Sequence, residues 1–353
     1  MNKTNWARMC LALLLLIFSF NVSAQKTFKN PILPGFHPDP SICRVENDYY
    51  MVTSSFEWFP GLPIFHSKDL VNWEQIGHVL DRPSQLQMKD GLKASNGLWA
   101  PTIRYHQGTY YVICTATGCG GNFFVTADSP EGPYSEPIFI KDAPGIDPSL
   151  FFDEDGTMWY CGSINGDNKI PPRRYPAEDR IYVQQLDPST GQFIGERHIV
   201  SSGYAINSPY AEAPHIYKIK GKYYLMIAEG GTWENHAVSV FTADNIVGPY
   251  TPFICNPVLT HRHLGNDIDI TTIGHADLVQ TQNGDWYSVM LGVRPVNGFN
   301  MLGRETFLTP VEFQGEQPIF NPGVGRVLME EQFPKLPECP VIKPDNRDEF
   351  NGQ

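Results

Sequence analysis

The segment Lys220-Gly221-Lys222-Tyr223-Tyr224 decides the fold, because its pattern occurs five times along the chain. Polar or glycine turn residues precede aromatic residues and a β-prone run, which is typical of a β-hairpin. The other copies are Asn47-Asp48-Tyr49-Tyr50, Gln107-Gly108-Thr109-Tyr110-Tyr111, Asp155-Gly156-Thr157-Met158-Trp159-Tyr160 and Asn283-Gly284-Asp285-Trp286-Tyr287. They recur roughly every 50 to 65 residues, a spacing that indicates a repeat architecture.

A short strand precedes each of these hairpins, and further strands follow it. About four strands per unit, repeated five times, predict an all-β chain that folds as a five-bladed β-propeller over residues 25–333. The innermost strands of a propeller run along one central channel, so we expect their first residues to meet at one end of it. These first residues are Asp39, Trp99, Asp147, Glu212 and His275.

The charge of the chain restricts the class of partner. It has 38 acidic and 26 basic residues and a net charge of -12, which argues against nucleic acid or anionic lipid as a partner. A neutral substrate is more compatible with this charge. The sequence leaves the oligomeric state open.

The N-terminus has the parts of a secretory signal peptide. Basic residues precede an apolar run from Cys10 to Phe20, and small residues follow it at Ser23 and Ala24. The run is too short to span a bilayer, which takes about 20 apolar residues. We therefore expect residues 1–24 to be removed, and the mature protein, with no membrane span, to be periplasmic or extracellular.

Three of the five residues expected at the channel end are carboxylic acids. One carboxylic acid that protonates a leaving oxygen and one carboxylate that activates water or attacks carbon are the groups that hydrolyse a glycoside. A third acid can raise the pKa of the proton donor through like-charge repulsion. Asp39, Asp147 and Glu212 are thus candidate catalytic residues of a glycoside hydrolase.

Six short motifs lie at these strand beginnings and in later turns. They are Gly35-Phe36-His37-Pro38-Asp39-Pro40-Ser41, Trp99-Ala100-Pro101, Gly145-Ile146-Asp147-Pro148-Ser149, Glu212-Ala213-Pro214-His215, Gly274-His275-Ala276-Asp277 and Leu302-Gly303-Arg304-Glu305-Thr306. In this order, over about residues 29 to 320, the chain resembles glycoside hydrolase family 43, the inverting β-xylosidases and α-L-arabinofuranosidases. The resemblance implies an exo-acting enzyme that releases terminal xylose or arabinofuranose from oligosaccharides of plant xylan and arabinoxylan.

The resemblance also implies a role for each acid. Asp39 matches the general base that activates water, and Glu212 matches the general acid. Asp147 matches the residue that raises the pKa of the acid and orients it. One departure is Ala213, where many members of the family have glycine.

Substrate-binding residues follow from the resemblance and from the chemistry of sugars. Trp99 is expected to pack on a sugar face, with Phe56, Trp58 or Trp73 completing the wall, because apolar sugar faces stack on aromatic rings. Arg304 matches an arginine that binds sugar hydroxyls, although it could instead pair with Glu305. Thr232 lies where members of the family line the pocket.

His275 matches a central histidine that lies beside a calcium ion or a water cluster in many members of the family. A hydrogen-bonded core histidine is equally compatible with the sequence, since calcium prefers oxygen ligands. We expect no required organic cofactor and leave a structural calcium open. Cys114 and Cys119 could form a disulfide or remain buried thiols.

Other interpretations of the same residues stay open. An endo-arabinanase or a galactosidase could use this fold, and a carbohydrate-binding propeller without catalysis could use the same aromatic residues. Residues 334–353 resemble a linker toward a C-terminal β-sandwich, which is absent from this sequence.

Overall fold

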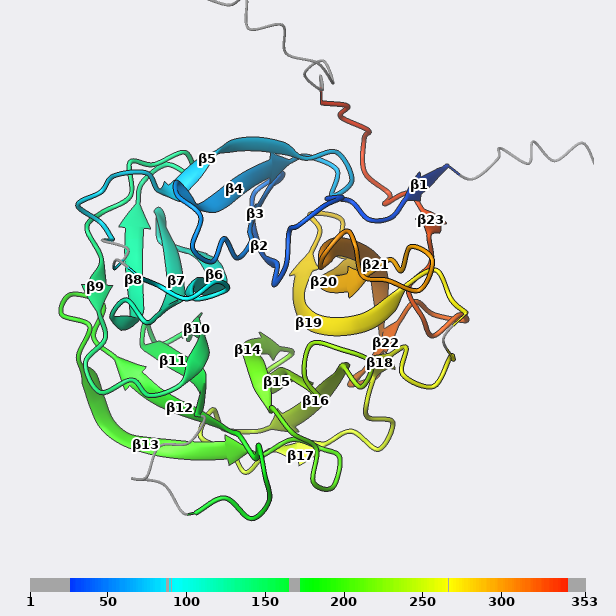
Figure 1. The fold of residues 1–353 in the computed structure, drawn as a ribbon. Coiled ribbons are helices and arrows are strands. Elements are labelled where there is room, and N and C mark those ends of the chain that lie inside the picture. Colours follow the sequence, from blue (N-terminus) through cyan, green and yellow to red (C-terminus); the bar gives the residue numbers. More distant parts are fainter. Residues whose placement is uncertain (1–25, 87–88, 90, 165–171, 266, 342–353) are drawn as a thin grey trace, which may run out of the picture.

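The computed structural model describes residues 26–86, 89, 91–164, 172–265 and 267–341, and within these ranges every regular element is a β-strand. Five antiparallel sheets are arranged around a common centre, which confirms the predicted five-bladed propeller (Figure 1). No helix in the described part of the chain is long and apolar enough to cross a membrane. The expected signal peptide at residues 1–24 and most of the expected linker, from residue 342 onward, lie outside the described residues.

The blades follow one another along the chain, and each is built from consecutive strands. Blade 1 contains β2 (Ser41–Val45), β3 (Asp48–Val52), β4 (Gly61–Ser67) and β5 (Glu74–Leu80). Blade 2 contains β6 (Gly97–His106), β7 (Thr109–Thr117), β8 (Gly121–Ala127) and β9 (Ile138–Phe139). Blade 3 contains β10 (Ile146–Phe152), β11 (Met158–Ile164), β12 (Arg180–Leu186) and β13 (Phe193–Ser201).

Blades 4 and 5 complete the circle. Blade 4 contains β14 (Glu212–Ile219), β15 (Lys222–Glu229), β16 (Ala237–Ala243), β17 (Thr251–Pro252) and the short β18 (Leu259–Thr260), which pairs with β16. Blade 5 contains β19 (Thr271–Gln280), β20 (Trp286–Val293), β21 (Glu305–Gln314) and β22 (Gln317–Phe320). A separate pair, β1 (Thr27–Lys29) and β23 (Glu330–Gln332), brings the two ends of the described chain together at the periphery, beside blade 5.

The five predicted hairpin turns connect the first two strands of each blade, as expected. The first strands, β2, β6, β10, β14 and β19, lie beside one another around the centre (Figure 1). Their beginnings are therefore close in space although they are far apart in the sequence.

The beginnings of these inner strands share an unusual backbone conformation. Asp39, Ala100, Asp147, Ala213 and His275 all have positive φ values, between 44° and 56°. The strand register shifts at this point in blades 2 to 5, which is the mark of a β-bulge and re-aims the side chains there. Positive φ is uncommon outside glycine and gathers at functional sites.

This shared conformation corrects the alignment of the repeats. The sequence aligned Trp99 and Glu212 with Asp39, Asp147 and His275. In the structure, the positions equivalent to those three are Ala100 and Ala213. Trp99 and Glu212 therefore precede the equivalent positions, Ala100 and Ala213, by one residue.

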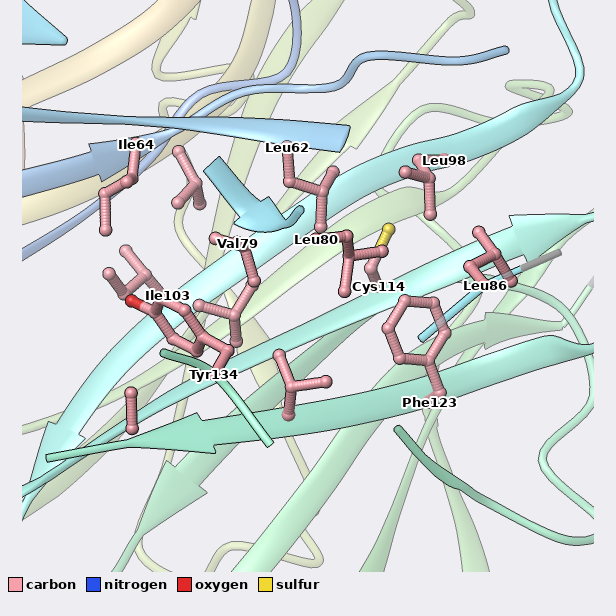
Figure 2. Packing of buried hydrophobic residues seen from close by; sticks show 14 of the residues in the cluster. Leu62, Ile64, Val79, Leu80, Leu86, Leu98, Ile103, Cys114, Phe123 and Tyr134 are labelled. Atoms are coloured by element: carbon pink, nitrogen blue, oxygen red, sulfur yellow. The ribbon is translucent and has the colours of Figure 1, made fainter. Parts of the chain in front are cut away.

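Apolar clusters fill the space between neighbouring blades. Figure 2 shows the contact between blades 1 and 2, where β4 and β5 pack on β6, β7 and β8. Its labelled residues are Leu62, Ile64, Val79, Leu80, Leu86, Leu98, Ile103, Cys114, Phe123 and Tyr134. Full burial of one such leucine contributes about 1.5–3 kcal/mol. Cys114 and Cys119 are both buried thiols here, so the structure favours the alternative without a disulfide.

Candidate active site

A cavity of about 420 Å³ lies where the inner strands begin. It is lined by Asp39, Phe56, Ser95, Trp99, Ala100, Ile146, Asp147, Tyr210, Glu212, Gly231, Thr232, Trp233, His275 and Arg304. This size is within the usual range for small-molecule sites. A larger hollow, of about 1170 Å³, lies between blade 5 and the β1–β23 pair, but none of the three inner-strand acids lines it. We therefore take the smaller cavity as the candidate active site.

Asp39 is held in place from two sides. Its Oδ1 accepts a hydrogen bond from Arg304 Nη1 at 2.8 Å, and its Oδ2 accepts one from the Ser54 hydroxyl at 2.6 Å. The Ser54 oxygen in turn accepts a hydrogen bond from the backbone N–H of Ala100. Burial acts to raise the pKa of Asp39, but Arg304, His275 and Ser54 together outweigh it, so the pKa lies below the usual value. Asp39 is therefore a carboxylate at neutral pH.

Glu212 is in the opposite electrostatic state. Burial and the nearby carboxyls of Asp147, Asp179 and Asp39 raise its pKa well above the usual value. No described residue donates a hydrogen bond to its carboxyl group, and the nearby Arg304 offsets only part of the effect of burial and of the other acids. Glu212 is therefore set up to keep its proton near neutral pH.

Asp147 affects the position and the pKa of Glu212. Its Oδ2 accepts a hydrogen bond from the backbone N–H of Ala213 at 3.1 Å, which fixes the chain next to Glu212. Burial also raises the pKa of Asp147, with a smaller contribution from Asp39. A carboxyl here both orients the strand that carries Glu212 and disfavours a second negative charge.

The alternative role that the sequence left open for Arg304 is not supported. Glu305 is fully buried and pairs with Arg294 through two contacts of 2.6 and 2.8 Å, and it also accepts the N–H of Gly35. Arg304 instead contacts Asp39 and lies 5.5 Å from the centre of the Phe56 ring. Its guanidinium lines the cavity beside the carboxylate.

Two of the expected aromatic residues line the cavity. Trp99 is oriented by a hydrogen bond from its Nε1 to the Ser95 carbonyl at 2.7 Å. Phe56 lies 6.3 Å from Trp99, between ring centres, and stacks on Phe36. Thr232 also lines the cavity.

The position of Trp73 corrects the expectation that it belongs to the pocket wall. Its Nε1 donates to the Leu70 carbonyl at 2.8 Å, and its ring packs on the apolar cluster that joins blades 1 and 5. Trp58 is not among the lining residues either, and its side chain is largely exposed. Sequence alone does not distinguish these rings from those that line a pocket, because both kinds follow turns in the same blade.

Two aromatic residues of the cavity were not expected from the sequence. Tyr210 precedes Glu212 by two residues, and Trp233 directly follows Thr232. Their closeness to predicted site residues was an available signal. Both lie in connections between strands, outside the repeating pattern that identified the other residues.

His275 has few partners that suit a calcium ion. Its Nδ1 lies 3.8 Å from Asp39 Oδ1, and that oxygen already pairs with Arg304. Within the described ranges, no group of three or more His, Cys, Asp or Glu side chains is arranged to hold a metal ion. These donors do not fit a calcium ion bound directly by side chains, since calcium takes six to eight oxygen ligands. We assign no chemical step to a metal.

The cavity thus combines a carboxylate with a lowered pKa, a carboxyl group with a raised pKa and aromatic walls. An acid and a base with opposite pKa shifts in one pocket can protonate a leaving group and activate water in the same reaction. The remaining groups, Arg304 and Thr232, can donate hydrogen bonds to a polar neutral ligand.

Several known proteins are similar to this chain in sequence and in structure. Residues 28–318 match the family described as Glycosyl hydrolases family 43. A protein of Butyrivibrio fibrisolvens named "Xylosidase/arabinosidase" is 48% identical over 311 residues, which cover 88% of this chain and 59% of that protein. A protein of Bacteroides ovatus named "Non-reducing end alpha-L-arabinofuranosidase BoGH43B" is 44% identical over 354 residues, which cover 98% of this chain and 63% of that protein.

A solved structure has the same fold. The crystal structure of a xylan beta-1,4-xylosidase from Bacillus halodurans superposes with a TM-score of 0.84 at 39% identity, over 92% of this chain and 62% of that one. The chain thus spans about three-fifths of the length of these relatives. Because the family match extends over most of its length, the chain belongs to glycosyl hydrolase family 43.

Proposed function

We propose that this propeller is an inverting, exo-acting glycoside hydrolase that releases terminal xylose or arabinofuranose from oligosaccharides of xylan and arabinoxylan. The observation that carries the proposal is the pair formed by Asp39 and Glu212. The two groups line one cavity, and their pKa values are shifted in opposite directions.

In the proposed reaction, Glu212 donates its proton to the glycosidic oxygen as the bond from that oxygen to the anomeric carbon breaks. A water molecule on the opposite face of the sugar bonds to the anomeric carbon and loses a proton to Asp39. One direct displacement of this kind inverts the configuration at that carbon. Side chains and water are sufficient for these steps, so we propose no organic cofactor.

The other residues of the site support the same chemistry. Asp147 holds the backbone at Ala213 and, as a neighbouring acid, favours the protonated form of Glu212. Arg304 keeps Asp39 ionised. The names of the relatives include both xylosidase and arabinofuranosidase, and this supports the two pentoses as candidate products.

Hydrolysis of two aryl glycosides tests the proposal. We expect the protein to hydrolyse 4-nitrophenyl β-D-xylopyranoside, 4-nitrophenyl α-L-arabinofuranoside or both, and NMR of the first-formed sugar to show the inverted anomer. A retained anomer would contradict the assignment of Asp39 as a base. Binding of xylo-oligosaccharides without hydrolysis of any glycoside would instead indicate a carbohydrate-binding propeller, and cleavage only within longer chains would indicate an endo-acting enzyme.

The N-terminal segment supports a proposal about location. The basic, apolar and small-residue regions of residues 1–24 are typical of an exported protein. We infer that the enzyme acts on oligosaccharides in the periplasm or outside the cell.

A further inference from the structure

The proposed function divides the cavity into two sides. A general acid must lie beside the glycosidic oxygen that it protonates, so the leaving group lies on the side of Glu212. The water that attacks comes from the side of Asp39. Aromatic residues next to Glu212 therefore contact the leaving group, whereas those next to Asp39 contact the sugar that water attacks.

Phe56 belongs to the Asp39 side. It stacks with the guanidinium of Arg304, which binds Asp39 Oδ1. We assign Tyr210 and Trp233 to the Glu212 side from the position of Tyr210 in the chain and from its ring contact with Trp233. Tyr210 precedes the acid by two residues, and its ring centre lies 5.6 Å from that of Trp233, with the two rings nearly perpendicular at 81°.

The loop that carries Trp233 is built around this ring. Gly230 and Gly231 have φ values of +92° and +78°, which side chains rarely adopt. A Cβ atom on Gly231 would lie 2.7 Å from Trp233 Cζ2, so the ring occupies the place that a side chain would take. The N–H of Gly230 donates to the Pro209 carbonyl at 2.9 Å and thereby ties this loop to the segment of Tyr210 and Glu212.

Core packing does not explain the position of Trp233. Its side chain is 46% exposed, although the ring lines the cavity. An exposed indole that packs over Gly231 and is supported edge-on by a tyrosine offers an apolar face to a ligand. Pyranose rings have apolar faces that stack on such aromatic surfaces.

We propose that Trp233, positioned by Tyr210 and Gly231, is the platform for the leaving-group sugar. The inference rests on the proposed function, because the assignment of Glu212 as the acid defines the leaving-group side. Its consequence is a preference for substrates in which a second sugar ring follows the bond that is cleaved. A substrate with a small leaving group gains nothing from Trp233.

The experiment compares two substrates of the pentose that the unaltered enzyme prefers. For xylose these are xylobiose, which has a second ring, and methyl β-D-xylopyranoside, which has none. For arabinofuranose they are an arabinofuranosyl xylo-oligosaccharide and the methyl α-L-arabinofuranoside. We expect Trp233→Ala to lower kcat/KM for the two-ring substrate about 5- to 10-fold, as expected for the loss of one stacking contact. The value for the methyl glycoside should stay within about twofold.

Two further variants make the result specific. Trp233→Phe keeps an aromatic face and should recover most of the loss on the two-ring substrate. Phe139→Ala is the matched control, because Phe139 is 43% exposed, lies over a glycine in the same manner, at Gly120, and is outside the cavity. This variant should leave kcat/KM unchanged for both substrates.

The possible failures are distinguishable. An equal loss of kcat/KM on both substrates, or no loss on either, would overturn the role of Trp233 while leaving the proposed function intact. Inactivity of the unaltered protein on every pentoside would contradict the proposed function, and this inference with it.

Discussion

The central channel contains two clusters of polar side chains, and the pKa of Glu212 in the first is raised whereas the pKa of Asp277 in the second is lowered. The first consists of Asp39, Asp147 and Glu212 at the beginnings of the inner strands. The second, which we call the Asp277 cluster, lies further along the same strands and consists of Asp277, Arg104, Ser41, His215 and Tyr217. Asp147 and Asp277 are both buried, yet the pKa of Asp147 is raised to about 6 and that of Asp277 is lowered, so burial alone does not determine the charge of an acid.

Hydrogen bonding makes the difference. Asp277 Oδ2 accepts from the Ser41 hydroxyl at 2.6 Å and from Arg104 Nη1 at 2.9 Å, while Oδ1 accepts from the Tyr217 hydroxyl at 2.6 Å. Although burial acts to raise the pKa of Asp277, Arg104 and these donors hold it far below its usual value. The Glu212 carboxyl has no such donors among the described residues, and its pKa rises. Donors around a buried acid thus keep it ionised, whereas a buried acid without donors favours its protonated form.

His215 belongs to the Asp277 cluster through its contact with Arg104. Arg104 Nη2 lies 3.0 Å from His215 Nδ1, and because arginine can only donate, this nitrogen must accept. Burial lowers the pKa of His215 to about 3, so the imidazole is neutral. The cluster joins strands of blades 1, 2, 4 and 5, which indicates a role in holding the ring together.

The largest expected effect concerns the proton of Glu212. Glu212→Gln removes the acid with little change in shape, and we expect kcat/KM to fall about 10²- to 10⁴-fold for oligosaccharides, whose leaving groups need a proton. Substrates with strongly acidic phenol leaving groups should lose far less. A series of aryl pentosides of different phenol pKa measures this dependence.

A uniform loss over that series would contradict the role of Glu212 as the acid. The control is the urea unfolding midpoint of the variant. It should not fall, since the amide has nearly the same shape and burial disfavours the charged form of the carboxyl group that it replaces.

The sequence predicted the blades better than it predicted the register of the site. The five hairpins identified the fold because each combines a turn with a strand of known period. The positions at the beginnings of β6 and β14 were aligned one residue too early, because a hydrophobic pattern does not reveal a β-bulge. The proline that follows Asp39, Ala100, Asp147 and Ala213 would have given the correct alignment.

The aromatic residues show a second limit of prediction. Trp73 and Trp233 both follow strands and turns, yet one packs in the core and the other lines the cavity. Which of them faces a ligand depends on loop geometry, such as the positive φ values of Gly230 and Gly231. Residues far apart in the sequence determine that geometry.

The second expected effect concerns the Asp277 cluster. Asp277→Asn leaves Arg104 buried without its countercharge, and we expect a loss of about 3–5 kcal/mol in the free energy of unfolding. The urea unfolding midpoint at neutral pH measures this loss. Asp244→Asn is the control, because Asp244 forms an exposed ion pair with Lys222 and should leave the midpoint unchanged.

The pH dependence of this loss has a definite sign. The pKa of Asp277 is depressed in the folded state, so its contribution to stability is fully present above the unfolded value of about 3.9 and disappears only as the pH falls further. The difference between the unaltered protein and Asp277→Asn should therefore be constant from about pH 5 to 8. A variant as stable as the unaltered protein would contradict the structural role of this cluster.

The smallest expected effect concerns Asp179, which connects the surface of blade 3 to the site. Its carboxyl is buried and pairs with Arg173 at 2.8 Å, and the carbonyl of nearby Ala177 accepts the N–H of Tyr210. Burial raises the pKa of Asp179 to about 6, so its carboxyl is mostly charged at neutral pH. This charge is one of those that raise the pKa of Glu212.

Asp179→Asn removes that charge, and the pKa of Glu212 should fall. The acid then loses its proton at lower pH, so the alkaline limb of the pH–kcat/KM profile should move to lower pH. The acidic limb, which reports Asp39, should stay within experimental error. Asp187→Asn, at an exposed turn of the same blade, should move neither limb, and a shift of the alkaline limb to higher pH in Asp179→Asn would show that the pKa of Glu212 is not controlled by its acidic neighbours.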